Sequence, residues 1–289
     1  MTKFILRRLG LMGLTAISLT LIVFVLTNLA PNLEKLAKTQ GNSRMTDAEV
    51  SSWLDRNGYT RPMMVRYGEW LGVAPGWVGE DSQARPIGRC LAPGASLADS
   101  PTHCGLLQGD LGYSTYFRED VSDVIGLRLG YTGVLMLWVM VVMVPLALII
   151  GILAGMREGS TGDRVLSTFS ILTTSTPEYV SGVLFIAVFS SSVVGLKWFK
   201  GTAASAMDGV TFENFALPVA TMALYGMGYI ARMTRASMAE VMTAPYIRTA
   251  RLKGLSFFTI VTRHALRNAL IAPFTVIMLQ FPWLLTGVV

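Results

Sequence analysis

The sequence is poor in charged residues. Only 15% of its 289 residues are charged, and the mean hydropathy is +0.51. An ordinary soluble domain is about 25% charged, so this chain cannot cover a soluble surface with charge. The composition excludes a soluble enzyme, a disordered chain and a fibrous protein, and it predicts an all-α polytopic membrane protein.

The signatures of catalytic and metal sites are also missing. Neither of the two histidines, His103 and His264, stands in the spacing of a zinc site, and no serine stands in a G-x-S-x-G turn. No lysine follows a glycine, so the sequence has no P-loop for ATP. We expect no catalytic residue, no metal and no cofactor on this chain.

Five apolar stretches each approach the length of a membrane span, which needs about 20 residues as a helix. They are residues 9–31, 131–155, 165–193, 215–231 and 269–289. The first is longer than the apolar core of a cleaved secretory signal, and no clear cleavage site follows it. We therefore expect it to be retained as a transmembrane helix, with residues 1–31 forming the first segment of the protein.

The placement of lysine and arginine predicts how these helices are oriented. Basic residues collect on the cytoplasmic side of a membrane. Three precede the first stretch, and segment 232–267 has seven against one acid, whereas segment 32–128 has more acids than bases. We expect the N-terminus and residues 232–268 in the cytoplasm and residues 32–128 outside. The basic net charge is then a topology signal, and no nucleic-acid partner is implied.

The external segment carries both cysteines, Cys90 and Cys104. An even number of cysteines outside the cytoplasm predicts a disulfide, and closing a loop of about fifteen residues is worth roughly 3 kcal/mol. Thr46 and Glu49 form a capping-box pattern that predicts a helix to about residue 57. Residues 77–101 are rich in Gly, Pro and Ser and predict a loop.

The most informative segment lies between the fourth and fifth apolar stretches. Pro245 suits the first turn of a helix, residues 246–253 can form two turns, and Gly254 is a good terminator. Ser256 can cap a second helix that leads into the last stretch. The pattern predicts a short, basic, bent pair of helices within the core region 129–289.

The residues of this segment resemble a known motif. The run Tyr246-Ile-Arg-Thr-Ala-Arg-Leu-Lys-Gly-Leu-Ser256, followed by Arg263-His-Ala-Leu-Arg-Asn-Ala-Leu270, resembles the EAA loop of bacterial ABC importer permeases, in their dipeptide/oligopeptide branch. The start Phe4-Ile-Leu-Arg-Arg8 and the run Gly109-Asp-Leu-Gly-Tyr-Ser114 are similar to that branch as well.

The resemblance implies a type I permease helix bundle in the bacterial inner membrane, with six spans, five of them in this sequence, and a small external domain after the first span. It implies a second permease, two cytoplasmic ATPases that carry the ATP and Mg²⁺, and an external solute-binding protein. The substrate would be a peptide or a similar small solute. In this family the loop docks on an ATPase, which makes the following residues coupling candidates: Tyr246, Ile247, Arg248, Thr249, Ala250, Arg251, Lys253, Gly254 and Leu255.

Glu178 is the only charged residue inside an apolar stretch. A carboxylate in a membrane helix is normally turned inward, and the preceding Pro177 is expected to kink the helix. The two residues could line the translocation path, or Glu178 could hydrogen-bond between packed helices.

Two other classes of function are compatible with several spans. An ion-coupled secondary transporter normally shows ionisable residues in several spans and internal repeats. A membrane sensor with an external ligand domain needs a soluble output domain. This sequence shows no ionisable residues in several spans, no internal repeat and no soluble output domain, so it favours the permease.

Overall fold

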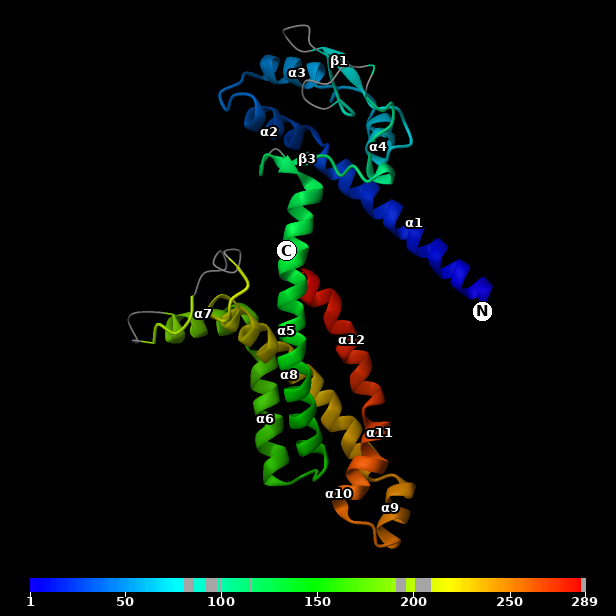
Figure 1. The fold of residues 1–289 in the computed structure, drawn as a ribbon, viewed down its shortest axis with the longest axis vertical. Helices are drawn as coiled ribbons and strands as arrows, with labels where there is room; N and C mark the ends of the chain where they lie inside the picture. The colour runs from blue at the N-terminus through cyan, green and yellow to red at the C-terminus, as the bar shows by residue number, and fades with distance from the viewer. Residues whose placement is uncertain are drawn as a thin grey trace. The chain divides into compact units, whose positions relative to one another are not determined.

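The computed structural model describes residues 1–80, 86–91, 98, 100–114, 116–190, 196–200 and 209–286. The chain divides into two compact units, Met1–Ile125 and Gly126–Val289 (Figure 1). Each unit has its own buried residues and is described by itself. Helix α5 (Val121–Gly155) begins in the first unit and belongs mainly to the second.

The first unit is a long helix followed by short helices and two small hairpins. Helix α4 (Met63–Leu71) packs on the last turns of helix α1 (Thr2–Thr27). The Tyr67 hydroxyl lies 2.8 Å from the Thr20 hydroxyl, and the centre of the Tyr67 ring lies 5.3 Å from that of the Phe24 ring. The elements are α1 (Thr2–Thr27), α2 (Ala30–Gln40), α3 (Asp47–Arg56), α4 (Met63–Leu71), β1 (Val78–Glu80), β2 (Pro86–Gly88), the 3₁₀ turn η2 (Leu106–Gln108), β3 (Tyr113–Ser114) and β4 (Glu119–Asp120).

Helix α3 begins at the capping box that the sequence predicts. The Thr46 hydroxyl accepts a hydrogen bond from the Glu49 backbone N–H, and the Glu49 carboxylate accepts one from the Thr46 N–H, which completes the capping box. Residues 77–101 were expected to be a loop, and this is wrong in part. Strands β1 and β2 pair there as an antiparallel hairpin, with Gly79 opposite Ile87. Strands of three residues are too short for an alternating pattern to show in the sequence.

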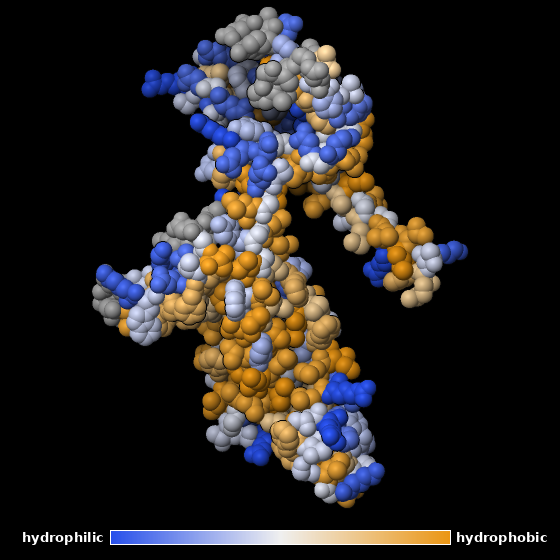
Figure 2. Space-filling view, in the orientation of Figure 1, coloured by the Kyte–Doolittle hydropathy of each residue, from blue (hydrophilic) through white to orange (hydrophobic). Residues whose placement is uncertain are grey.

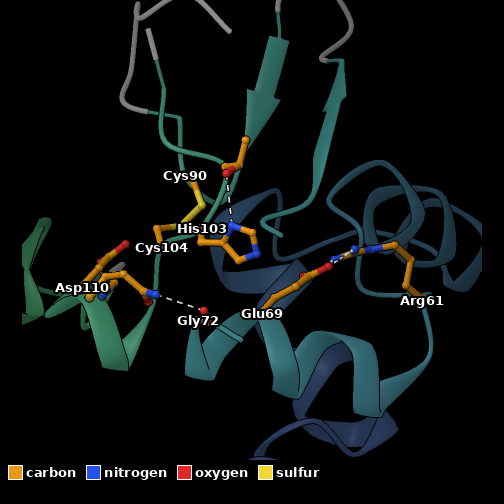
Figure 3. The surroundings of a disulfide bond; sticks show 10 residues. Arg61, Glu69, Gly72, Cys90, His103, Cys104 and Asp110 are labelled. Carbon is orange, nitrogen blue, oxygen red and sulfur yellow. Dashed lines mark hydrogen bonds and ion pairs between the residues drawn. A yellow bond between two sulfur atoms is a disulfide. The ribbon is translucent and has the colours of Figure 1, made fainter. Parts of the chain in front are cut away.

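Cys90 and Cys104 form the predicted disulfide, with their Cα atoms 5.5 Å apart. Figure 3 shows that the bond ties the segment after β2 to the segment that leads to η2. A covalent link at this point compensates for a small apolar core, which in this unit includes the buried side chains of Ala37, Val50 and Tyr67.

The second unit is a helix bundle. Helix α8 contacts α6, α7 and α12 along its length (Figure 1). After α5, the elements are α6 (Thr161–Ser175), α7 (Glu178–Phe189), α8 (Phe212–Met242), α9 (Pro245–Leu252), α10 (Phe257–Thr259), the π-helical turn η4 (Ile260–Ala265), α11 (Leu266–Ala269) and α12 (Ile271–Thr286).

By length and composition, α1 and α5 are each able to cross a membrane. Within the part of the chain that the structure describes, two bent pairs, α6 with α7 and residues 257–269 with 271–285, bring the candidate spans to as many as four if each pair is one span. The surface over the bundle is correspondingly apolar, while that over α2 and α3 is hydrophilic (Figure 2). The predicted stretch 215–231 lies in α8, which is not among these candidates. Because α8 is surrounded by other helices, it can keep Gly, Tyr and Thr residues that a lipid-facing helix would replace.

The third predicted stretch is not one kinked helix. Helices α6 and α7 meet at 98°, and Pro177 caps α7 instead of lying inside it. Thr176 before the proline takes an extended ψ of 119° because the proline ring excludes the helical conformation there. The end of that stretch, residues 191–193, lies outside the described residues, as do residues 287–289 of the last one.

Glycines allow α5 to approach α8 closely. A methyl group on Gly151 would lie 2.4 Å from Cβ of Thr234, and one on Gly155 would lie 2.6 Å from the Arg235 carbonyl. Around this contact, side chains of α5, α8 and α12 form one core, which includes Val139, Met143, Ile230 and Leu284. Small residues at such spacing are how membrane helices bring their backbones together.

Replacing Gly151 by alanine should therefore destabilise the chain, because overpacking costs about 1–3 kcal/mol. Gly133 on the same helix is the matched control, since no atom lies within 4 Å of its added methyl group. Gly133→Ala should leave stability unchanged or raise it by up to about 1 kcal/mol through helix propensity. Thermal unfolding of both variants in detergent gives the comparison, and equal midpoints would contradict the close packing.

Candidate coupling site

Helix α9 forms where the local sequence predicts it. Pro245 occupies its first turn after an extended Ala244, and Lys253 caps its end. Gly254 then takes a φ of +76°, a left-handed conformation that costs a residue with a side chain about 1 kcal/mol or more. The Ser256 hydroxyl accepts a hydrogen bond from the Thr259 N–H and starts α10. The chain continues into the π-helical turn η4, which no sequence signal indicated.

One face of α9 is fixed to the rest of the bundle. Ile247 and Ala250 are buried, and they pack in a cluster with Met238 and Met242 at the end of α8. Residues of η4 and α11 complete this cluster: Ile260, Val261, Ala265 and Ala269. Helix α9 is thus joined to the end of α8 by a shared apolar cluster.

A polar bond adds to this anchor. The Asn268 side-chain amide donates to the Tyr246 hydroxyl at 2.9 Å, which joins the start of α9 to α11. These two residues are 22 positions apart, and both belong to the resembling motif. Tyr246 is therefore partly a structural residue, with 41% of its surface exposed.

The opposite face of α9 and the following turn are exposed and carry apolar side chains. Leu252 is 81% exposed, Phe258 76% and Leu255 38%. Four other coupling candidates are exposed beside them: Arg248, Thr249, Arg251 and Lys253. An exposed apolar patch with basic residues is typical of a protein-binding surface.

The nine coupling candidates differ in burial, and two of them are buried. Ile247 and Ala250 face inward and serve the fold. Leu252 and Phe258 belong to the exposed surface, although the motif did not single them out. The available signal was helical spacing, because Leu252 lies four residues after Arg248 and shares its exposed face.

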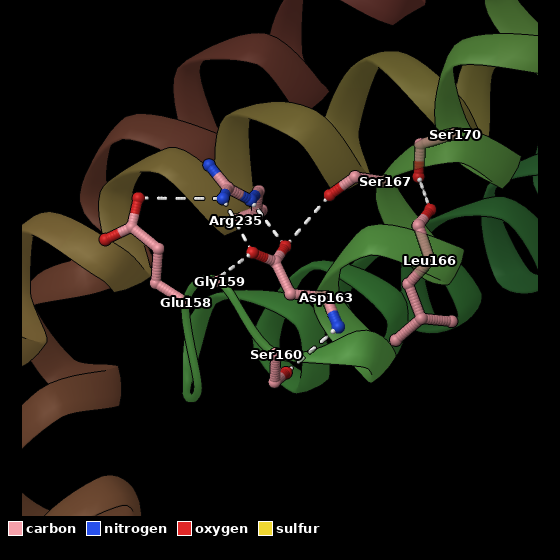
Figure 4. A network of polar contacts seen from close by, with 8 residues as sticks. All are labelled: Glu158, Gly159, Ser160, Asp163, Leu166, Ser167, Ser170 and Arg235. Carbon is pink, nitrogen blue, oxygen red and sulfur yellow. Dashed lines mark hydrogen bonds and ion pairs between the residues drawn. The ribbon is translucent and has the colours of Figure 1, made fainter.

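A network of polar contacts holds the end of α8 to the start of α6 (Figure 4). The Arg235 guanidinium donates two hydrogen bonds to the Asp163 carboxylate, at 2.7 and 2.8 Å. The Gly159 N–H and the Ser167 hydroxyl donate to the same carboxylate, and Glu158 lies 3.6 Å from Arg235. The Asp163 side chain is 3% exposed, so its charge is matched entirely within the protein.

This network was missed in the sequence, where Arg235 counted only as one of the cytoplasmic bases. The residues are 72 positions apart, and no spacing rule links them. Because Gly155 also contacts the Arg235 backbone, the ends of α5, α6 and α8 meet at one point. That point lies directly before α9 in the chain.

The other predicted site residues lie on another part of the second unit. Pro177 and Glu178 stand at the sharp turn between α6 and α7. Glu178 is half-buried, and its Oε2 atom is buried without a hydrogen-bond partner among the described residues.

Comparison with known proteins identifies the family. Residues 147–289 match the profile of the inner membrane component of binding-protein-dependent transport systems. A Brucella ovis protein named as a peptide permease is 31% identical over 284 residues, which cover 96% of this chain and 78% of that protein. This chain belongs to the ABC importer permeases.

Two other relatives match a shorter part. A Brucella abortus protein named as a peptide transport system permease is 35% identical over 185 residues, covering 63% of this permease and 58% of the relative. The glutathione transport system permease of Escherichia coli O6:H1 is 36% identical over 181 residues, or 63% and 56% of the two chains. The protein is therefore a multi-pass inner-membrane subunit of an ABC importer, as the loop motif indicated.

The Asp163–Arg235 pair yields a stability prediction. Asp163→Asn should cost about 1.5–3 kcal/mol, the contribution of hydrogen bonds to a charged group, and Arg235→Gln should cost a similar amount. In the double variant the two losses should be less than additive, because each removes the same interaction. Thermal melting in detergent measures these effects.

Arg232→Gln, an exposed arginine on the same helix, is the control and should leave the midpoint unchanged. Strict additivity in the double variant would show that the pair does not act as a unit.

Proposed function

We propose that this permease forms half of the translocation path of a peptide importer. Its partners would be a second homologous permease, two cytoplasmic ATPases that bind ATP and Mg²⁺, and an external solute-binding protein. The names of two relatives as peptide permeases and of a third as a glutathione permease support this substrate class, since glutathione is itself a small peptide. The chain itself would hydrolyse no ATP.

One observation carries this proposal. Helix α9 combines a buried face, fixed to α8 through Ile247, with an exposed face that carries Leu252 and three basic side chains. A subunit that is driven by a separate ATPase needs such a helix. One face is fixed to the subunit's own helices, and the other face binds the partner. The exposed leucine would enter an apolar pocket of the ATPase, and the basic residues would meet acidic groups around it.

Leu252→Glu should abolish substrate-stimulated ATP hydrolysis and uptake by the assembled importer in proteoliposomes. The thermal stability of the isolated permease should not change, because the Leu252 side chain is almost fully exposed. Leu107→Glu is the matched control in the stability measurement, as it adds a carboxylate at another exposed leucine, which is 69% exposed. If the Leu252 variant kept normal uptake, α9 would not be the ATPase contact.

The orientation follows from the same proposal. With α9 at the ATPases, an N-terminus on the cytoplasmic side places residues 32–128 outside. The disulfide supports this, because such bonds persist in the oxidising periplasm and are rare in the cytoplasm. The external unit would then be available to the solute-binding protein.

Glu178 and Pro177 would lie beside the path. A buried carboxylate oxygen without a partner needs a donor from elsewhere, and the amino group of a peptide or a group on the second permease can supply one. The turn of 98° at Pro177 gives the carboxylate its place at a break between two helices.

Glu178→Gln should reduce the uptake of lysine-containing peptides relative to neutral ones. The loss should reach about tenfold, since a hydrogen bond to a charged group contributes about 1.5–3 kcal/mol. Competition between the two peptide classes in one uptake assay measures this ratio. The control is Glu213→Gln, an exposed residue in the first turn of α8. An unchanged ratio in the Glu178 variant would exclude the carboxylate from substrate selection.

A further inference from the structure

The first unit contains a cavity with an excess of positive charge. Its volume is about 350 Å³, and the described residues that line it include Arg61, Arg66 and Arg89 but a single carboxylate, Glu69. That volume is at the lower end of small-molecule sites, about 300–1,000 Å³. The question is which of the three guanidinium groups the protein itself neutralises.

Arg61 is neutralised by Glu69 (Figure 3). Both terminal nitrogens of the guanidinium contact the carboxylate, with Nη2 2.7 Å from Oε2. The Glu69 side chain is 6% exposed and accepts from Arg61 through both of its oxygens. The Arg61 guanidinium also lies 5.5 Å from the ring centre of Trp77. This pair forms a neutral wall of the cavity.

The other two arginines have no carboxylate partner among the described residues. Arg66 is 9% exposed, donates to the Tyr59 carbonyl at 2.7 Å, and lies 5.2 Å from the Tyr59 ring centre. Burial lowers the pKa of its guanidinium. The Nε atom of Arg89 is buried with no hydrogen-bond partner in the described structure. Desolvated cations of this kind are costly unless an anion accompanies them.

The fold holds Arg89 in place from both sides. Its backbone N–H donates to the Trp77 carbonyl at 2.9 Å, which continues the β1–β2 hairpin. The next residue, Cys90, is bonded to Cys104. The backbone of Arg89 is therefore fixed before any ligand arrives, which reduces the entropy cost of binding one.

The cavity opens where a membrane helix ends. Phe24 from the last turn of α1 and Asn28, its C-cap, contribute to the lining. Helix α1 is a candidate span with exposed apolar side chains along it, such as Leu19 and Ile22. Tyr59 and Trp77 line the same cavity, and such aromatic residues are typical of the membrane–water interface. With α1 in the membrane, this position would lie at the depth of the lipid headgroups.

We propose that this cavity binds a phosphate group, supplied by the headgroup of an anionic phospholipid, with Arg66 and Arg89 as its ligands. Arginine forks match phosphate oxygens, and basic pockets beside membrane helices accept anionic headgroups. The bound lipid would neutralise the buried Arg66 and the half-buried Arg89. A free phosphate ion has the same chemistry and is the alternative source.

The proposal can be tested by native mass spectrometry. The protein is placed in nanodiscs that contain equal amounts of phosphatidylglycerol and phosphatidylcholine, and it is released from them for the measurement. The wild type should retain phosphatidylglycerol selectively. Arg89→Gln should lower the amount of retained phosphatidylglycerol at least tenfold. Arg89→Lys, which keeps the charge, should lower it less. Arg56→Gln, an exposed arginine of α3 with no ion pair among the described residues, should behave as the wild type.

A second experiment separates the two sources. Calorimetric titration of the protein in phosphatidylcholine nanodiscs with inorganic phosphate should show weak binding that Arg89→Gln removes. Strong phosphate binding together with no lipid selectivity would assign the site to a soluble anion and overturn the lipid proposal. Equal lipid retention by the wild type and the Arg89→Gln variant, with the disulfide intact in both, would also overturn it.

Discussion

The close contact of α5 with α8 is the constraint on which the second unit depends. Lipid is as apolar as leucine, so membrane helices gain little from burying apolar side chains and associate through tight packing. Gly151 and Gly155 supply it by removing the side chains that would separate the two backbones. Helices α6, α7 and α12 then surround α8, and the core from Val139 to Leu284 fills the remaining space.

The same contact lies close to the residues that join α9 to the rest of the bundle. Near Gly155, the Asp163–Arg235 pair joins the start of α6 to α8, only a few residues before the cluster around Ile247. An interior packed at this density transmits displacement instead of absorbing it. Movement of α9 by a bound partner would therefore reach α5, α6 and α8 together.

The first unit is stabilised by interactions of a different kind. Its apolar core is small, and a disulfide, a capping box and a buried ion pair between Arg61 and Glu69 hold short elements together. This leaves polar and charged side chains in its interior, which a larger apolar core would exclude. Of the three arginines that line its cavity, one has a carboxylate partner among the described residues and two have none.

Sequence alone determined the features that depend on neighbouring residues. Pro245 and Gly254 delimit α9, Thr46 and Glu49 start α3, and the apolar stretches mark most of the membrane helices, because each signal acts within one or two turns of the chain. The disulfide followed from having only two cysteines. Contacts between distant segments were decided by the tertiary structure. The pairing of Asp163 with Arg235, the inward face of Ile247 and the gathering of three arginines around one cavity depend on which segments meet, and no local spacing encodes that choice.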